Sequence, residues 1–584
     1  MPIHNPDIAR VFQNIADLLE IGNADPFRIR AYRNAARTVG ECNVELAELI
    51  ERGEPLPKIP GVGADLAGKI KEICTTGQCS ALTDLQREVP PAIAGLLAIP
   101  GMGPKRVQTL YRELAISTPE QLLECAQRGA IRELRGFGAR VEQKILEAVS
   151  RHSQRDTRTL RAMAKPYVES LLGRLRRLPE VIRADTAGSY RRGRDTVGDI
   201  DLVVSARSGG AVCQAFAAFD EVGEVLARGR TRASVVLKSG LQVDLRVVED
   251  ASFGAALLYF TGSKPHNIAL RRIAQGRGLK INEYGIYRGE KRLAGAEEAD
   301  VYAVLDLPWI APELREDRGE IDAARDGHLP RLLERAQMRG DLHMHTRASD
   351  GRADIRSMAL AARALGHEYV AITDHSQRLR VTNGLDVARL RRQMAEIDRL
   401  QRNEELGITL LKGIEVDILR DGSLDLPDAV LEQLDIVIGA VHSHFDLPRR
   451  EQTERLLRAL EHPVLDVLAH PGCRLIGQRE PCDFDFQAVL RQAAKHHCAL
   501  ELDAQPERLD LTENDCRAAK EHGVPICIDS DAHSTEGLRY LDDGVIQARR
   551  GWIETADVLN TFPLAKLRSW LHPHPHARAA RGRA

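Results

Sequence analysis

Two aspartates two positions apart, Asp199 and Asp201, end the segment GSYRRGRDTVGDID of residues 188–201. This pair begins an apolar run, DIDLVVSA, that predicts a strand, so both carboxylates would project from one face of it. Converging carboxylates repel each other unless cations lie between them, and carboxylates with substrate phosphates commonly hold Mg²⁺ or Mn²⁺. The segment therefore indicates nucleotidyl transfer. An exposed strand with alternating charge is the alternative, and the flanking Gly-Ser pair and arginines argue against it.

A third carboxylate, Asp244, lies in the second of two alternating apolar runs, SVVLKSG and LQVDLRVV. The runs meet at Ser239 and Gly240, which predicts a hairpin. We expect Asp244 to complete a metal site with Asp199 and Asp201. A lone Asp on a strand more often faces solvent, so this assignment depends on the pair.

Histidines recur in the C-terminal part of the chain, where apolar runs end in metal-binding residue types and helical patterns follow. The runs lie at 341–346, 369–376, 408–417, 434–445, 465–472, 498–505 and 524–534. Seven strand-helix units predict a parallel barrel with ligands at the carboxyl ends of its strands. The histidines accompany Asp350, Glu415 and Asp531. A single HxH pair is equally common on a protein surface. Five histidine clusters at strand ends instead indicate a metal site, and imidazole with carboxylate favours Zn, Mn or Fe.

Three similar segments in the first 150 residues have the form apolar-x-Gly-apolar-Gly followed by a helical pattern, at 59–70, 99–110 and 134–145. Paired glycines permit a tight turn, and the N–H groups that begin the next helix can bind a phosphate without reading sequence. The candidate DNA-binding residues are Gly61, Gly63, Gly101, Gly103, Lys105, Arg106, Gly136 and Gly138. A simple interhelical turn explains one copy, whereas three copies favour DNA.

Length and composition restrict the class of protein. The chain has 584 residues, which predicts several domains, and a net charge of -2 that neither supports nor excludes nucleic acid. Between residues 121 and 250, however, 23 Lys and Arg face 17 Asp and Glu. Ten cysteines without CxxC spacing indicate neither a zinc ribbon nor a disulfide framework. Since no signal sequence or long apolar run occurs, we expect a cytoplasmic, reduced protein with no membrane segment.

The ordered motifs GSYRRG, GDID, VDLR, YFTGS and INEY closely resemble the family X DNA polymerases, over roughly residues 1–290. The resemblance implies that Asp199, Asp201 and Asp244 hold two catalytic ions, Mg²⁺ or Mn²⁺. It also implies which residues surround the incoming dNTP. The triphosphate contacts would be Ser189, Arg192 and Gly198. The sugar and base would be bordered by Tyr259, Gly262 and Asn267, and Arg271 would lie near the templating strand.

A lysine in the first glycine segment bears on a further activity. Animal repair members of this family carry a lyase that uses a lysine as a Schiff-base nucleophile. Lys69 matches that nucleophile. Asp65 and Arg28 stand where the supporting lysines would be, which argues against lyase activity.

The order HxH, SDG, TDH, GIEVD, VHSHF, AHPG and DAHS resembles the PHP (polymerase and histidinol phosphatase) family over about 235 residues. The resemblance implies three metal ions (Zn²⁺, Mn²⁺ or Fe²⁺) and phosphoester hydrolysis. The three ligand sets would be His343, His345, Glu415 and Asp531; Glu415, His442 and His470; and Asp350, His375 and His533. His444 is expected outside the ligand shell. Beside a polymerase core, this chemistry implies a 3′–5′ exonuclease, with action at abasic sites or blocked 3′ ends as an extension.

The predicted fold is multidomain, α+β and α/β. It has a helical helix-hairpin-helix N-terminal region, a nucleotidyltransferase palm with a mixed sheet, and a C-terminal distorted (β/α)7 PHP barrel. The predicted segments are a helical domain with the first hairpin (1–85), a fingers-like hairpin region (86–150), the palm and nucleotide-binding subdomain (151–312), a linker (313–338), the PHP domain (339–575) and a basic tail (576–584).

The whole order is similar to bacterial family X DNA polymerases with a C-terminal PHP domain. It implies a monomeric repair enzyme that fills short gaps in gapped or primed DNA from dNTPs and trims 3′ ends. One alternative is a nucleotidyltransferase on RNA or a small molecule with an attached PHP phosphatase, which the hairpin repeats argue against. The other is a DNA-binding scaffold with inactive cores, which the complete carboxylate and ligand sets argue against.

Overall fold

The structure is a computed structural model that describes residues 3–571, except for several short gaps. The residues outside the description within this range are 4, 23, 41, 43–45, 58, 60, 89–92, 94–95, 97–101, 103, 135–136, 139–140, 144, 147–157, 380–381 and 404–405. The chain forms two compact units. The first contains Met1–Ala187, Thr196–Phe253 and Gly477–Arg479, and the second contains Gly188–Asp195, Gly254–Ile476 and Glu480–Ala584. The boundaries of the six predicted segments stay a prediction.

Short helices make up the N-terminal part of the first unit, as predicted. They are α1 (Asn5–Ile21), α2 (Pro26–Gly40), α3 (Leu46–Glu51), α4 (Ala64–Thr76), α5 (Ser80–Glu88), α7 (Pro104–Leu114) and α8 (Pro119–Gln127). Apolar residues at helical spacing, such as Ile8, Phe12 and Ile15 of α1, are buried in a core shared with α2. Leu110 and Leu122 belong to a second core, which includes α7 and α8.

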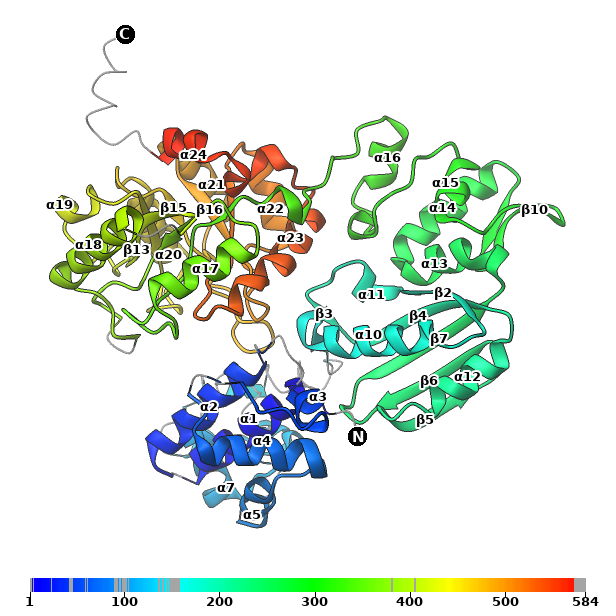
Figure 1. The fold of residues 1–584 in the computed structure, drawn as a ribbon, viewed down its shortest axis with the longest axis horizontal. Coiled ribbons are helices and arrows are strands. Elements are labelled where there is room, and N and C mark those ends of the chain that lie inside the picture. Colours follow the sequence, from blue (N-terminus) through cyan, green and yellow to red (C-terminus); the bar gives the residue numbers. More distant parts are fainter. Residues whose placement is uncertain are drawn as a thin grey trace, which may run out of the picture. The chain divides into compact units, whose positions relative to one another are not determined.

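A mixed five-stranded sheet forms the palm of the first unit, which confirms the predicted palm. Its order is β2 (Val181–Thr186), β4 (Asp199–Ala206), β7 (Gln242–Val248), β6 (Arg232–Leu237) and β5 (Val222–Arg228) (Figure 1). Strands β4 and β7 are parallel and the other pairs are antiparallel. Gly240, with φ of 89°, makes the turn between β6 and β7, so the predicted hairpin is confirmed. Helices α10 (Arg161–Arg176) and α12 (Gly209–Ala217) pack on the sheet, and β1 (Thr159–Leu160) pairs with β3 (Thr196–Val197).

The second unit begins with the segment that carries the Gly-Ser pair. Its first elements are α11 (Gly188–Arg191), α13 (Phe253–Thr261), α14 (Lys264–Gly276), β8 (Lys280–Asn282), β9 (Gly285–Arg288), β10 (Lys291–Ala294), α15 (Glu298–Ala303) and the 3₁₀ turn η3 (Pro312–Leu314). The predicted linker is partly helical, with α16 (Glu320–Arg325) and η4 (Arg335–Gln337). Ile321 and Ala324 of α16 join the same apolar core as Leu305, so this stretch packs rather than merely connecting.

Seven parallel strands form the barrel, in chain order: β11 (Gly340–Asp341), β12 (Tyr369–Ile372), β13 (Thr409–Asp417), β14 (Ile436–Ala440), β15 (Val467–Leu468), β16 (Ala499–Asp503) and β17 (Ile526–Asp529). Met344 and Ala532 form a parallel bridge, and the Leu342 amide donates to Asp529 Oδ1 at 2.7 Å. These contacts join the first strand to the last. The predicted (β/α)7 barrel is therefore confirmed, and the barrel is nearly closed.

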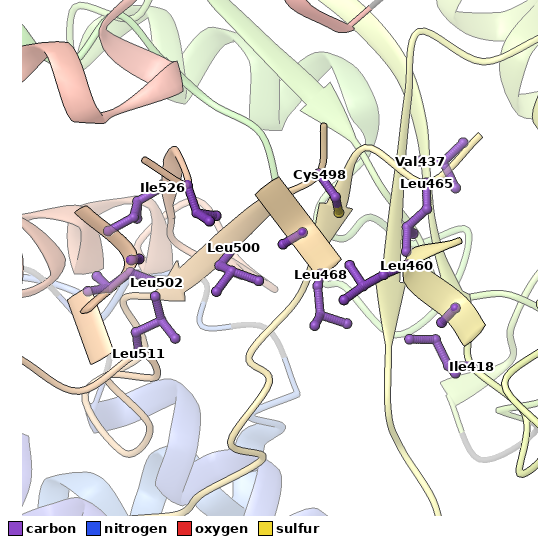
Figure 2. Packing of buried hydrophobic residues seen from close by; sticks show 14 of the residues in the cluster. Ile418, Val437, Leu460, Leu465, Leu468, Cys498, Leu500, Leu502, Leu511 and Ile526 are labelled. Atoms are coloured by element: carbon purple, nitrogen blue, oxygen red, sulfur yellow. The ribbon is translucent and has the colours of Figure 1, made fainter. Parts of the chain in front are cut away.

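Helices cover the outside of this barrel (Figure 1). They are α17 (Ile355–Ala364), α18 (Val387–Asn403), α19 (Asp428–Leu431), α20 (Arg449–Leu460), α21 (Phe486–His496), α22 (Glu513–Glu521), α23 (Leu541–Arg550) and α24 (Leu564–Leu571). Figure 2 shows part of the apolar layer between these helices and the strands, with Leu460 of α20 and strand residues such as Leu468 and Leu500. Among the described residues, we find no helix whose length and apolar character would let it span a membrane.

A buried carboxylate, Glu298 at the start of α15, ties several parts of the second unit together. Arg191 binds both of its oxygens at 2.8 Å, and Arg315 binds the same two at 2.7 and 3.2 Å. Burial raises the pKa of Glu298, but the hydrogen bonds and charges of Arg191 and Arg315 outweigh burial and lower this pKa to about 2. Arg315 itself is fully buried.

We expect Glu298→Gln to lower the free energy of unfolding by about 3–5 kcal/mol, because Arg315 would keep a buried charge without its partner. The pKa in the unfolded chain is near 4.5, so this contribution is complete above that pH and is lost as the pH falls towards 2. Urea unfolding at pH 7 and pH 3 should therefore show a smaller pH effect in the variant. Asp306→Asn, in an exposed pair with Arg277, is the control. Equal pH effects in both proteins would contradict the assignment.

Candidate active sites

Three carboxylates share one face of the palm sheet. Asp201 on β4 lies directly beside Asp244 on the parallel strand β7, and Asp199 lies two residues before Asp201. Ile200 and Leu202, which alternate with the aspartates, are fully buried on the other face. Strand pairing thus brings together the three residues that the sequence singled out, and oxygen ligands of this kind suit Mg²⁺ or Mn²⁺.

Two neighbours orient Asp244. Gln242 donates from Nε2 to Asp244 Oδ2 at 2.9 Å, and the hydroxyl of Ser234 donates to Oδ1. Ser234 lies opposite Asp244 in the β6–β7 pair. Ser234 was not predicted because only the register between β6 and β7 shows that it faces the carboxylate. Gln242 lies two residues before Asp244 on the same strand, so the period of two was the signal that could have identified it. Gly198, just before β4, lies where a Cβ atom would be 3.4 Å from Arg158 Nη1.

The expected nucleotide contacts from the second unit gather around the second Gly-Ser loop. Arg192 donates from Nη1 to the Thr261 carbonyl and pairs through Nε with Glu316 at 3.1 Å. Gly262 has φ of 72°, and a Cβ atom there would lie 3.2 Å from Arg192 Nη1. The guanidinium of Arg192 therefore lies against this loop, and the loop requires glycine. Ser189 lies three residues before Arg192, on α11.

The remaining three expected nucleotide contacts form a chain of hydrogen bonds on α13 and α14. Asn267 donates from Nδ2 to the carbonyl of Tyr259 at 2.7 Å, and Arg271 donates from Nε to the carbonyl of Asn267 at 3.2 Å. The Tyr259 side chain is exposed. The structure thus brings these three residues together and leaves an aromatic surface available to a base.

The glycine segments fit phosphate binding where they are described. Gly61 has φ of 76°, and the extended Gly63 precedes α4 with no side-chain cap, so the first N–H groups of α4 stay available to a phosphate. Gly138 begins another helical turn, since its carbonyl accepts from Val141. Lys105 is exposed at the start of α7. Gly101, Gly103 and Gly136 lie outside the described residues.

Lys69 on α4 is paired rather than poised as a nucleophile. Its ammonium binds Asp65 Oδ1 at 2.5 Å. Burial lowers the pKa of Lys69, but the hydrogen bond to Asp65 and the neighbouring Tyr32 outweigh burial and raise this pKa overall. A Schiff-base amine reacts as the neutral form and needs a lowered pKa. The pairing therefore argues against lyase chemistry.

The predicted ligands of the barrel converge at the carboxyl ends of its strands. Three groups have ligand atoms within 4.8 Å of one another: His343, His345 and Glu415; His375, Glu415 and His442; and His345, Asp350, His375 and His533. His470 Nε2 is 3.1 Å from Glu415 Oε1, and His345 Nε2 is 2.9 Å from Asp531 Oδ1. The resemblance had assigned His345 and His375 to one ion each, whereas here each faces two groups. His444 is exposed and lies outside all three groups.

The donor atoms of these groups fit metal ions. His375 Nδ1 and Glu415 Oε2 are 2.5 Å apart, yet neither has a hydrogen bond of acceptable angle, and both are buried. His345 Nδ1 and Asp531 Oδ1 are likewise buried without a hydrogen bond. Buried polar atoms normally have partners, so donors that converge without bonding each other point to ions between them. Imidazole with carboxylate suits Zn²⁺, Mn²⁺ or Fe²⁺.

Two further carboxylates orient the histidines. His343 donates from Nδ1 to Glu501 Oε1 at 2.5 Å, and His442 donates from Nδ1 to Asp417 Oδ1 at 3.0 Å. Each carboxylate fixes the tautomer, so that Nε2 faces the ion. Glu501 on β16 also accepts from the His470 amide at 2.9 Å. Neither carboxylate was predicted, and the only sign of them in the sequence is an acidic residue within the apolar run ALELD and another at the end of GIEVD.

Opposite charges act against the effect of burial at Glu415 and His442. Burial raises the pKa of Glu415, but the charges of His375 and His442 outweigh it and hold this pKa well below its usual range. Burial lowers the pKa of His442, whereas Glu415 and Asp417 raise it to about 9. Glu415 is therefore a carboxylate at neutral pH, and its oxygens are available to cations.

We expect Glu501→Gln to weaken metal binding about 10–100-fold, because His343 would lose the carboxylate that orients its ring. Metal content after dialysis against graded chelator measures the effect. Glu521→Gln, an exposed carboxylate on α22, is the matched control and should retain wild-type metal. Wild-type retention by the Glu501 variant would show that this carboxylate does not support the centre.

Comparisons with known proteins match several separate parts of the chain. Family models match residues 3–79 (Helix-hairpin-helix domain), 93–151 (SAM-like Helix-hairpin-helix tandem), 256–316 (DNA polymerase beta thumb) and 341–504 (PHP domain). The "DNA polymerase/3'-5' exonuclease PolX" of Bacillus subtilis is 38% identical over 574 residues, which cover 97% of this chain and 99% of that protein.

Other relatives match about a third of this chain. A "Probable phosphatase" of Acetivibrio thermocellus is 32% identical over 203 residues, 33% of this chain and 78% of that protein. A "Probable phosphatase" of Syntrophotalea carbinolica is 30% identical over 210 residues, 34% of this chain and 81% of that protein.

Proposed function

The chain belongs to the PolX family of DNA polymerase/3′–5′ exonucleases, and we propose that it is a repair enzyme that fills short DNA gaps from dNTPs and trims 3′ ends. The observation that carries the polymerase function is the register of β4 and β7. It places Asp201 beside Asp244, with Asp199 on the same face. No residue of this carboxylate set is replaced.

In the palm, Asp199, Asp201 and Asp244 would hold two ions, Mg²⁺ or Mn²⁺. When bound, these ions would activate the primer 3′-hydroxyl and neutralise the negative charge of the departing pyrophosphate. Ser234 and Gln242 hold Asp244 in place. Arg192 adds positive charge where the triphosphate becomes more negative, and Ser189 binds a phosphate oxygen. The hairpin glycines and Lys105 bind the DNA backbone without reading its sequence.

In the barrel, His343, Glu415, His442 and the other ligands would hold three ions. When bound, these ions supply Lewis-acid activation of water and of the scissile phosphodiester. Glu501 and Asp417 orient the imidazoles, and Glu415 contributes an oxygen to each of two neighbouring groups. A 3′–5′ exonuclease on the same chain as a polymerase would remove terminal nucleotides, and damaged 3′ ends or abasic sites are the proposed extension.

A second candidate activity for the barrel is phosphomonoester hydrolysis, which the relatives named probable phosphatases favour. Release of inorganic phosphate from a 3′-phosphorylated primer, compared with release of mononucleotide from an unmodified primer, separates the two. The helix-hairpin-helix matches favour DNA over a small-molecule substrate for the chain as a whole.

We also propose that the enzyme works as a monomer in the cytoplasm. All ten cysteines are free thiols, which suits a reducing compartment. The proposed substrate, DNA with a short gap, lies in that compartment in a bacterium.

Extension of a primer in a one-nucleotide gap tests the polymerase function. With Mg²⁺ or Mn²⁺ and each dNTP in turn, we expect incorporation of the templated nucleotide. Asp244→Ala should lower the rate by about a hundredfold or more, because an ion loses a ligand at the reacting centre. DNA affinity should stay unchanged by fluorescence anisotropy, and the exposed Asp220→Ala is the control. Untemplated or absent extension by the wild type sinks the proposal.

His343→Ala should remove nuclease activity and spare gap filling, because the residue belongs only to the barrel groups. Release of labelled 3′ nucleotides and primer extension, measured on the same preparation, give both rates. His328→Ala, an exposed histidine outside the ligand groups, should alter neither. Loss of both activities in the His343 variant would argue against two independent sites.

A further inference from the structure

An arginine of the barrel, Arg550, contacts the segment that carries the nucleotide-binding Arg192. Arg550 ends α23, and its side chain is 1% exposed. Its Nη1 donates to the backbone carbonyl of Arg192 at 2.7 Å and to Glu316 at 3.1 Å, and its Nη2 donates to Glu513 at 3.0 Å. One guanidinium thus holds the main chain of Arg192 and the carboxylate that pairs with the Arg192 side chain.

Glu316 is shared between two guanidinium groups. It binds Arg192 Nε and Arg550 Nη1, each at 3.1 Å. Burial raises the pKa of Glu316, but the charges of Arg192 and Arg550 outweigh burial and lower this pKa, so the group is ionised. An anion whose charge is divided between two cations binds each of them less strongly than it would bind one.

Positive charge exceeds negative charge in this cluster. Glu513 also binds Arg194 at 3.3 Å and Arg318 at 3.1 Å. The two carboxylates Glu316 and Glu513 therefore face four guanidinium groups, those of Arg192, Arg194, Arg318 and Arg550. The formal excess is two positive charges, four against two. Such an excess favours an anionic ligand at the exposed side of the cluster.

The backbone of the segment also packs directly on α23. Gly193, with φ of 69°, lies where a Cβ atom would be 2.3 Å from Ile546 Cγ2 and 3.6 Å from Arg550 Cδ. A side chain at position 193 therefore does not fit without movement. This close approach is independent of the charges, and it shows that α23 fixes the position of the main chain next to Arg192.

We propose that Arg550 is a positioning residue for polymerisation: it holds the Arg192 backbone and shares Glu316, so that Arg192 can exchange Glu316 for the triphosphate of the incoming dNTP. The inference rests on the proposed polymerase function. It goes beyond that function because a residue of the hydrolytic barrel sets the KM for dNTP at the palm.

Arg550→Ala tests the proposal by steady-state gap filling with the templated dNTP. Loss of the hydrogen bonds, with Glu316 left to Arg192 alone, should raise KM for dNTP about tenfold with little change in kcat. Arg550→Lys should recover part of this loss because the charge remains. Arg549→Ala is the matched control, since Arg549 lies on the same helix but pairs with Glu313 at 2.7 Å and should leave KM unchanged. Thermal unfolding and nuclease rate report whether each variant is folded.

The double variant Arg550→Ala/Glu316→Gln separates positioning from a merely structural role. Removal of the competing carboxylate should return KM most of the way towards the wild-type value, whereas a general loss of structure would not be rescued. Glu316→Gln alone, which leaves Arg550 paired with Glu513, should give a KM equal to or below that of the wild type.

The outcomes distinguish this inference from the proposed function. Failure of the wild type to extend gapped DNA overturns the function. A wild type that extends DNA, with a folded Arg550→Ala variant whose KM changes less than about twofold, overturns the inference alone. A raised KM in Glu316→Gln overturns it as well, and that variant decides the question if Arg550→Ala does not fold.

Discussion

Parallel strand pairing is the constraint on which both centres depend. Asp199, Asp201 and Asp244 repel one another, and so would remain apart on flexible loops. The hydrogen bonds between β4 and β7 fix them side by side, and burial of Ile200 and Leu202 on the opposite face resists their separation. Seven parallel strands do the same for the barrel ligands, since all of their carboxyl ends meet at one rim.

Beneath that rim lies a layer of buried polar groups that also joins the barrel ends. Asp529 Oδ1 accepts from the Leu342 amide at 2.7 Å and from Asn560 Nδ2 at 2.7 Å, and Asp341 accepts from Ser530. Burial raises the pKa of Asp341 to about 6, and it raises the pKa of Asp529 well above its usual value. Both carboxyl groups therefore bind a proton more readily than an exposed aspartate does. The first and last strands meet through hydrogen bonds rather than through a continuous ladder.

The residue pattern within one segment predicts the features that depend on that segment alone. The period of two in DIDLVVSA gave the strand and the shared face of Asp199 and Asp201, and the strand-end histidines gave the barrel. Ser234 and Glu501 escaped prediction because they reach the sites through neighbouring strands, and no spacing within one segment shows a register between segments. Residues 313–338 look like a connection because they are densely charged, yet two of those charges, Glu313 and Glu316, pair with arginines from distant parts of the chain.

The charged cluster around Glu316 is better explained by orientation than by stability. Taking ions out of water costs more free energy than packing apolar groups of the same size, so a buried arginine such as Arg550 is a weak source of stability. Its hydrogen bonds are directional, however, and they end on the main chain of Arg192 and on the partner of its side chain. The tight contact at Gly193 removes the remaining freedom of that backbone. Together these contacts determine where a guanidinium lies, which an apolar interface would leave less sharply defined.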